Sequence, residues 1–357
     1  MKESPNWSAT KWLLASLSPY HDIGHLQHDH AVWSRIFKTA DEGLVLPRLA
    51  LKLADHSETL PTEVDEFLNI ALELNRLRNS RLQDQLVTLL KSLNAVGVVP
   101  VVMKGAVQLL DTRFDIGSRV MFDIDIWTPN AVDQQTAMSC LLRLGYDMRG
   151  TMKDFKQCQH FPPFFLDGEL ARIELHHSMV GPTYTALIDE ASVVSRLSEQ
   201  SVKGVKFLLL DDFDAIKLSY IQCRSACEGG SVTMMKWLDL LDRCKTTGIN
   251  EVSGPWDFGM RTNGDAVDTR FLTSLNELGG FPYSGAIDRE LIEKWERAHN
   301  DPFGIQFVRK LVRAILGNAL NPARWRGKSA VDVRDALLFR LRNLPNSYKR
   351  AKNKNQH

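Results

Sequence analysis

Apolar residues recur at three- and four-residue steps along the first part of the chain, most clearly over residues 63–94. This spacing places them on one face of an α-helix, and we predict a helical N-terminal region up to about Gly97. From Val98 the pattern changes to a short β-branched run, VVPVVM, and Lys104-Gly105 then opens a segment of helical pattern over residues 106–110. This change predicts a strand that leads into a helix.

Further elements are predicted in the middle of the chain. Residues 121–127 alternate apolar and polar positions as a strand does, and residues 131–144 read as a helix that a glycine closes. Two apolar segments, residues 161–166 and 170–179, flank Asp167-Gly168, a dipeptide that favours a tight hairpin turn. We therefore expect a β-hairpin there.

Beyond Gly181 the pattern is helical again, and the predicted β-structure is confined to the middle of the chain. Asp211-Asp212 is a candidate N-cap for a helix over residues 213–227, and amphipathic stretches continue to Leu344. We predict an α+β fold whose nucleus is a mixed β-sheet. Its three regions are a helical N-terminal region (1–97), a core (98–200) and a helical C-terminal region (201–357).

The composition adds a broad class to this picture. The chain has 357 residues, 44% hydrophobic and 24% charged, values typical of soluble globular proteins with two or three folded units. No apolar run approaches the ~20 residues that cross a bilayer, and the first residues lack a signal peptide's hydrophobic segment, so we expect a cytoplasmic protein. Five cysteines without a zinc-binding pattern predict reduced, packed thiols.

The net charge of +1 conceals a basic tail. Residues 303–357 hold thirteen Lys and Arg against two Asp, which leaves about −10 for the rest of the chain. The tail is suited to an anionic membrane surface, to nucleic acid or to an acidic acceptor, and a plain solvated face is the alternative. Its basic stretch includes Arg309, Lys310, Arg313, Arg324, Arg326 and Lys328.

Asp123 and Asp125 are the first candidates for chemistry. Side chains two residues apart in a strand share a face, so both carboxylates point the same way, ~6–7 Å apart at the Cα atoms. They repel each other and raise one pKa unless a cation lies between them, which predicts a divalent metal. Another Asp-x-Asp, at residues 212–214, fits a helix start instead, and a solvated strand face is the alternative for the first pair.

Glu174 is a third candidate acid, in a strand where Arg172 and His176 share its face. Three carboxylates on two strands suit two-metal phosphoryl transfer with Mg²⁺, or with Mn²⁺ in its place. An ion pair with Arg172 or Arg119 is the alternative role for Glu174. His176 and His160 are able to donate to a phosphate or move a proton, or are simply packed.

Lys104 and Gly105 stand at the predicted junction of strand and helix. A glycine lets phosphate approach the backbone, the free N–H groups of a helix start attract it, and the lysine adds a positive charge. A surface lysine is the alternative. For Arg119 two roles stay open, a contact to a triphosphate or a structural pair with Asp115 or Asp123.

Four segments in order, VMKG at 102–105, RVMFDID at 119–125, LGY at 144–146 and IELH at 173–176, resemble the bacterial uncharacterised nucleotidyltransferase family. This family lies within the polymerase-β-like nucleotidyltransferase superfamily. Trp33 and the segment 235–240 extend the likeness weakly, to residues 30–245.

The resemblance implies roles for individual residues. Asp123 and Asp125 bind Mg²⁺, Glu174 completes the acidic triad, and Arg119 matches the family's arginine. Lys104 and Gly105 stand where the superfamily usually has Gly-Ser, a departure that bears on how triphosphate is held. Relatives also tend to carry histidines in the helix near residues 221–224, where this chain has Gln222 and Cys223.

From these residues we predict transfer of a nucleoside monophosphate from an NTP to a hydroxyl or phosphate acceptor, with pyrophosphate leaving. The predicted nucleotide-binding residues are Lys104, Gly105, Arg119 and His176, and Glu174 is predicted to help deprotonate the acceptor. Two alternatives remain: a non-catalytic protein that binds a nucleotide or partner, and an RNA-modifying transferase that uses the basic tail.

Overall fold

The computed structural model describes residues 5–23, 26, 28–153, 155, 158–228 and 234–248. The basic tail and the amphipathic stretches predicted up to Leu344 lie outside the described residues, so those predictions stay as they are.

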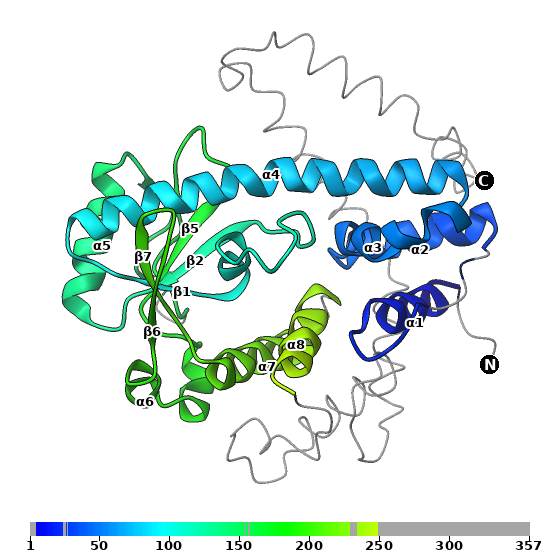
Figure 1. The fold of residues 1–357 in the computed structure, drawn as a ribbon. Helices are drawn as coiled ribbons and strands as arrows, with labels where there is room; N and C mark the ends of the chain where they lie inside the picture. Colours follow the sequence, from blue (N-terminus) through cyan, green and yellow to red (C-terminus); the bar gives the residue numbers. More distant parts are fainter. Residues whose placement is uncertain are drawn as a thin grey trace, which may run out of the picture.

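The N-terminal region is helical, as predicted. Its elements are α1 (Pro5–Leu17), α2 (His30–Glu42), α3 (Leu46–Leu53), the 3₁₀ helix η1 (Ala54–Thr59) and α4 (Thr62–Ala95). The 34-residue helix α4 runs along one whole side of the molecule, from the small helices to the sheet (Figure 1). Its first half packs into one hydrophobic cluster through Leu68 and Leu72, and its second half into another through Leu86 and Leu90.

A seven-stranded mixed sheet forms the core, in the order β3-β4-β5-β2-β1-β7-β6. Its strands are β1 (Val101–Val102), β2 (Asp123–Trp127), β3 (Asp147–Met148), β4 (Phe164–Phe165), β5 (Arg172–His176), β6 (Ser198–Val202) and β7 (Val205–Leu209). The pairs β2–β5 and β1–β7 are parallel and the others antiparallel. The predicted α+β class with a mixed sheet is confirmed.

The predicted elements of the middle region are present, although their bounds differ from the predicted ones. The strand–helix junction is β1 followed by the 3₁₀ helix η2 (Lys104–Leu109), and the predicted helix is α5 (Ala131–Arg143). The predicted hairpin is also present, since Phe164 of β4 pairs antiparallel with Ile173 of β5.

The prediction that the chain is helical throughout beyond Gly181 is wrong for β6 and β7, which form a hairpin. Lys203 and Gly204 join the strands with φ angles of 51° and 74°, and two positive φ angles fit the twist of a two-residue hairpin turn. Val205 and Phe207 of β7 are buried in the core of the sheet. Because β7 pairs with β1, this hairpin belongs to the same sheet, and the division of the chain at residues 97 and 200 stays a prediction.

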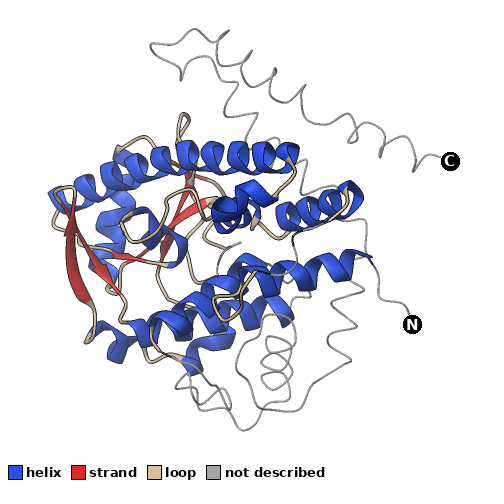
Figure 2. Cartoon of the chain, turned by 45° about the vertical axis from the view of Figure 1, so that its right-hand side comes forward, coloured by secondary structure: helices blue, strands red, loops and turns tan. Residues whose placement is uncertain are grey.

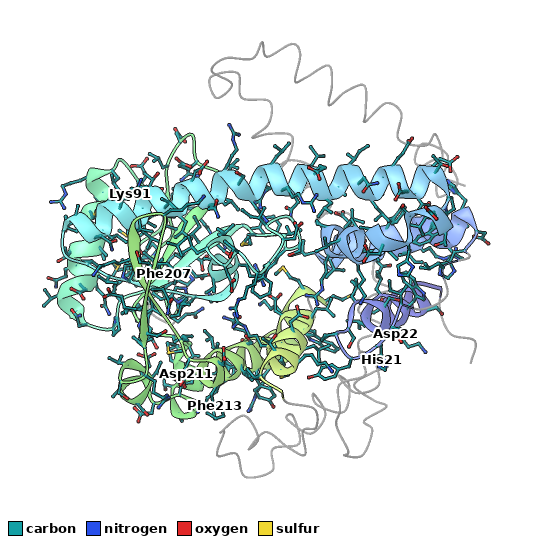
Figure 3. All side chains as sticks on the ribbon, in the orientation of Figure 1. His21, Asp22, Lys91, Phe207, Asp211 and Phe213 are labelled. Atoms are coloured by element: carbon teal, nitrogen blue, oxygen red, sulfur yellow. The ribbon has the colours of Figure 1, made fainter. Side chains whose placement is uncertain are left out.

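The remaining helices are η3 (Pro182–Leu187), α6 (Glu190–Val194), α7 (Asp212–Glu228) and α8 (Met234–Thr246). Asp211 Oδ1 accepts the backbone N–H of Asp214 at 2.7 Å, so Asp211 of the predicted pair caps α7. Figure 3 labels Asp211 and Phe213 at the start of this helix. The strands lie between α4 on one side and α7 and α8 on the other (Figures 1 and 2).

Strand alternation separates the two hydrophobic clusters. Val102, Ile124 and Ile126 belong to the cluster beneath α4, whereas Val101 and Trp127 belong to the cluster that includes α7 and α8. Asp123 and Asp125 share the face of Trp127, so the acids lie on the side of the sheet that α7 and α8 cover.

Two smaller sequence predictions, on the cysteines and on membrane-spanning helices, can be compared with the structure. Four free cysteines are described, Cys140, Cys158, Cys223 and Cys244, and all but the half-buried Cys158 are buried, as the sequence predicted. Within the part of the chain that the structure describes, no helix combines the length and apolarity that crossing a membrane requires.

Candidate functional site

The candidate site is built on the parallel pair β2–β5. The register places Asp123 beside Arg172, Asp125 beside Glu174 and Trp127 beside His176. Alternate residues of the two strands therefore present their side chains to one face, while Ile124 and Ile173 fill the core beneath. The three predicted acids are thus brought together, although 51 residues separate Asp123 from Glu174 in sequence.

Arg172 joins two of these acids. Its Nη2 donates to Asp123 Oδ2 at 3.0 Å and its Nε to Glu174 Oε1 at 2.8 Å. Burial, together with the negative charges of Asp125 and Glu174, raises the pKa of Asp123 to about 6. The ion pair with Arg172 that the sequence left open for Glu174 is present, and it orients Glu174 toward the other acids.

Lys104 and His176 converge on Asp125. Lys104 Nζ donates to Asp125 Oδ1 at 2.6 Å, and His176 Nε2 lies 2.9 Å from the same oxygen. Burial disfavours the charged ammonium, but the carboxylates of Asp125 and Glu174 outweigh it and raise the pKa of Lys104. Lys104 also has a φ of 53°, which lies in the left-handed region. This backbone conformation is strained for any residue other than glycine, and such strain is found most often at functional sites.

His176 lies between two oxygen acceptors and the ammonium of Lys104, whose Nζ is 3.4 Å from Nε2. Nδ1 lies 3.3 Å from the carbonyl oxygen of Ser178 and Nε2 2.9 Å from Asp125 Oδ1, and both neighbours are acceptors. A neutral imidazole carries one N–H, while burial and the charge of Lys104 lower the pKa of His176 and disfavour the imidazolium. A cation between Nε2 and Asp125 Oδ1 satisfies both atoms, and in the structure the ammonium of Lys104 takes this role.

Three residues of the site form a candidate metal-binding set. Ligand atoms of Asp125, Glu174 and His176 all lie within 4.8 Å of one another, and the three residues are buried. This set contains His176 but not Asp123, and Arg172 bonds the carboxylates of both Asp123 and Glu174. Carboxylates suit Mg²⁺, and an imidazole ligand also suits Mn²⁺. The roles of Asp123 as a metal ligand and of His176 in nucleotide binding stay predictions.

The two other histidines lie in different surroundings. His160 Nε2 is 3.7 Å from Glu174 Oε2, and its ring centroid is 5.4 Å from that of His176, so His160 belongs to the edge of the site. His177 packs against Phe161 with ring centroids 5.2 Å apart.

Arg119 makes a structural pair, but with a partner that the sequence did not indicate. Its Nε donates to Asp239 Oδ2 of α8 at 2.9 Å, because Asp115 is bound to Arg76 and Asp123 to Arg172. The guanidinium crosses directly over Gly105, where an added Cβ would lie 1.9 Å from Arg119 Nη1. Gly105 therefore permits a close approach of Arg119, and the phosphate contacts predicted for both residues stay predictions.

Helix α4 holds the loop that carries Arg119. Asn79 Nδ2 donates to the carbonyl oxygens of Ile116 and Arg119 at 2.6 and 2.7 Å, and Asn75 Nδ2 donates to that of Gly117 at 2.6 Å. Both asparagines are buried, so α4 fixes the backbone just before β2.

Two cavities adjoin the site. The larger, of about 390 Å³, lies between the N-terminal helices, the loop before β2 and α8, to one side of the carboxylates. The smaller, of about 20 Å³, is lined by Lys104 and by residues of α7 and α8. Gln108, Arg119 and Asp239 line both, so the two cavities are neighbours.

This mixed sheet, with carboxylates on adjacent parallel strands and a lysine directed at them, is a core of the nucleotidyltransferase type. A family model described as uncharacterised nucleotidyltransferase matches residues 29–229, more than half of the chain, and the chain belongs to this family. The resemblance found in the sequence is thereby confirmed. Comparison with curated proteins and with solved structures gives no match.

Proposed function

We propose that this protein transfers a nucleoside monophosphate from an NTP to a hydroxyl or phosphate acceptor, with a divalent cation at Asp125, Glu174 and His176. The observation that carries the proposal is the buried cluster of Asp125, Glu174 and His176, whose ligand atoms lie within 4.8 Å of one another, in a chain of the nucleotidyltransferase family. When bound, Mg²⁺ or Mn²⁺ supplies positive charge that neutralises phosphate oxygens and activates the acceptor oxygen.

The chain's own residues bind and orient the substrate. Lys104 Nζ, which bonds Asp125 in the structure, is placed to move to a phosphate oxygen when a nucleotide enters. Arg119, held by Asp239, presents its guanidinium beside Lys104 at the small cavity. The acceptor oxygen gives its proton to a carboxylate, a role we assign to Glu174, and forms a bond to the α-phosphorus. The bond from that phosphorus to the bridging oxygen breaks, and pyrophosphate leaves with the electron pair.

The test is a pyrophosphate-release assay of the full chain with each of the four NTPs, with Mg²⁺ or Mn²⁺, and with small hydroxyl acceptors or the protein itself as acceptor. Asp125→Asn is expected to abolish release. Asp147→Asn, at an exposed position of β3, is the matched control and is expected to retain it. Equal release by wild type and Asp125→Asn refutes the proposal.

A second function is favoured by one observation: the ammonium of Lys104 already neutralises Asp125, and Lys-Gly replaces the superfamily's usual Gly-Ser. Such a site suits a protein that binds a nucleotide or a partner without turnover. Calorimetric binding of ATP or CTP without pyrophosphate release supports it.

An RNA-modifying role depends on the basic tail, and a salt-dependent RNA affinity that is lost on deleting residues 303–357 supports that role.

A further inference from the structure

The small cavity beside Lys104 is strongly basic. Its lining comes from η2, from Arg119 before β2 and from the two helices α7 and α8. The full set is Lys104, Gln108, Arg119, Ser219, Gln222, Lys236, Asp239 and Arg243. Four cations thus surround one carboxylate, in a protein whose overall net charge is only +1.

Two of the four cations are already neutralised and two are not. Lys104 is paired with Asp125, and Arg119 with Asp239. Across residues 5–248 as far as they are described, Lys236 and the guanidinium of Arg243 have neither a hydrogen-bond acceptor nor an ion-pair partner. Burial lowers the pKa of Arg243, although the negative charge of Asp239 acts to raise it. The nearby carboxylates therefore do not fully offset the cost of burying the guanidinium's charge.

A third donor in the same place also lacks an acceptor. The Nε2 of Gln222 is shielded from water and has no hydrogen-bond partner among the described residues. Buried donors without acceptors destabilise a folded protein, and their concentration around one cavity indicates that a ligand supplies the acceptors. In the sequence, Gln222 was noted only as a departure from the relatives' histidines and Lys236 only within the segment 235–240. The packing of α7 on α8 brings both together with Arg243.

The size of the cavities limits what can enter. The smaller one has room for about one water molecule, and therefore for one or two oxygens of a ligand rather than for a whole nucleotide. The larger one, of about 390 Å³, lies next to it and shares Gln108, Arg119 and Asp239 in its lining. A ligand with a narrow, oxygen-rich, negatively charged end and a wider remainder fits this shape.

We propose that Gln222, Lys236 and Arg243, together with Lys104 and Arg119, bind the phosphate chain of a nucleotide, with its terminal oxygens in the small cavity. We call these five residues the α7–α8 cradle. That the ligand is a nucleoside triphosphate rests on the proposed function, whereas the binding of a polyphosphate rests on the cradle alone. A polyphosphate matches it because each phosphoryl group offers several charged acceptors to donors that approach from three parts of the fold.

The test is calorimetric titration of the full chain with inorganic triphosphate in EDTA. Wild type is expected to bind, and Arg243→Met and Gln222→Leu are each expected to weaken binding at least ~10-fold, the effect of losing a charge-assisted or buried hydrogen bond. Arg143→Met, at an exposed arginine of α5, is the control with the same change of charge and is expected to bind as wild type. Arg243→Lys, which keeps the charge, is expected to restore part of the affinity.

Thermal unfolding of the same variants separates a binding role from a structural one. Because Arg243 has no acceptor in the structure, Arg243→Met is expected to leave the melting temperature unchanged or to raise it. A wild type that does not bind triphosphate, or Arg243→Met and Gln222→Leu that bind it as wild type does, overturns the proposal. A lower melting temperature of Arg243→Met, with unchanged binding by Gln222→Leu, also overturns it.

The outcome for the cradle is distinguishable from the outcome for the transferase. Loss of triphosphate binding in both variants, with no pyrophosphate release by wild type, supports the cradle and refutes the transferase. Pyrophosphate release by wild type, with an unchanged KM for NTP in Arg243→Met, overturns the cradle and leaves the transferase standing.

Discussion

Replacing Gly105 with alanine tests whether this glycine is present because Arg119 crosses over it. The new Cβ would lie 1.9 Å from Arg119 Nη1 and 2.5 Å from Cζ, whereas ordinary contacts begin near 3.4 Å. The guanidinium must therefore move by about 1.5 Å, which the 2.9 Å bond from Arg119 Nε to Asp239 does not survive. The side chains of Arg119 and Asp239 are only 14% and 18% exposed, so water restores little of what is lost.

A hydrogen bond between charged groups contributes about 1.5–3 kcal/mol, so Gly105→Ala is expected to lower the free energy of unfolding by about 2–3 kcal/mol. Urea unfolding of wild type, Gly105→Ala, Arg119→Ala and the double variant measures this cost in both backgrounds. In the Arg119→Ala background the clash is gone, and Gly105→Ala is expected to change stability by less than ~0.5 kcal/mol or to increase it slightly. Equal costs in the two backgrounds would refute the reasoning.

Three further predictions concern metal binding and pH. Asp125→Asn is expected to weaken Mn²⁺ binding at least ~10-fold in calorimetry while Asp147→Asn does not, and equal affinities would remove Asp125 from the metal site. Lys104→Met is expected to bind Mn²⁺ more tightly than wild type when no nucleotide is present, because the ammonium no longer competes for Asp125; weaker binding would contradict this. Burial raises the pKa of Asp41 from 3.8 to about 6, so the folded protein holds a proton that the unfolded chain has released, and stability falls as pH rises from about 4 to about 6. Asp41→Asn is expected to remove this decrease and to stabilise the protein by about 1–3 kcal/mol at pH 7.5. Urea unfolding of wild type and variant at about pH 4 and at pH 7.5 checks this.

Local sequence pattern predicted the parts of the site that depend on strand geometry. Alternation along residues 121–127 placed Asp123 and Asp125 on one face, and the same rule placed Glu174 and His176 together on β5. What alternation does not determine is which strands are neighbours or in which register they pair. Alternation therefore did not indicate that Asp125, Glu174 and His176 bring ligand atoms within 4.8 Å of one another.

The missed features all depend on contacts between distant residues or on a weak turn signal. Arg119 pairs with Asp239, 120 residues away, and no property of either segment indicates that α8 packs against the loop before β2. The hairpin of β6 and β7 was missed because its turn, Lys203-Gly204, is short and its outer strand is mostly exposed, so little hydrophobic alternation marks it.

The two asparagines of α4 have a consequence for the proposed chemistry. Helix α4 is anchored at one end among the N-terminal helices and at the other beneath the sheet, and between these anchors Asn75 and Asn79 grip the backbone before β2. Because α4 is one continuous helix, a shift of its N-terminal half moves Asn75 and Asn79 as well. Substitutions in the N-terminal helices are therefore expected to shift Arg119 and to change the phosphate affinity proposed for it, without altering Asp123, Asp125 or Glu174.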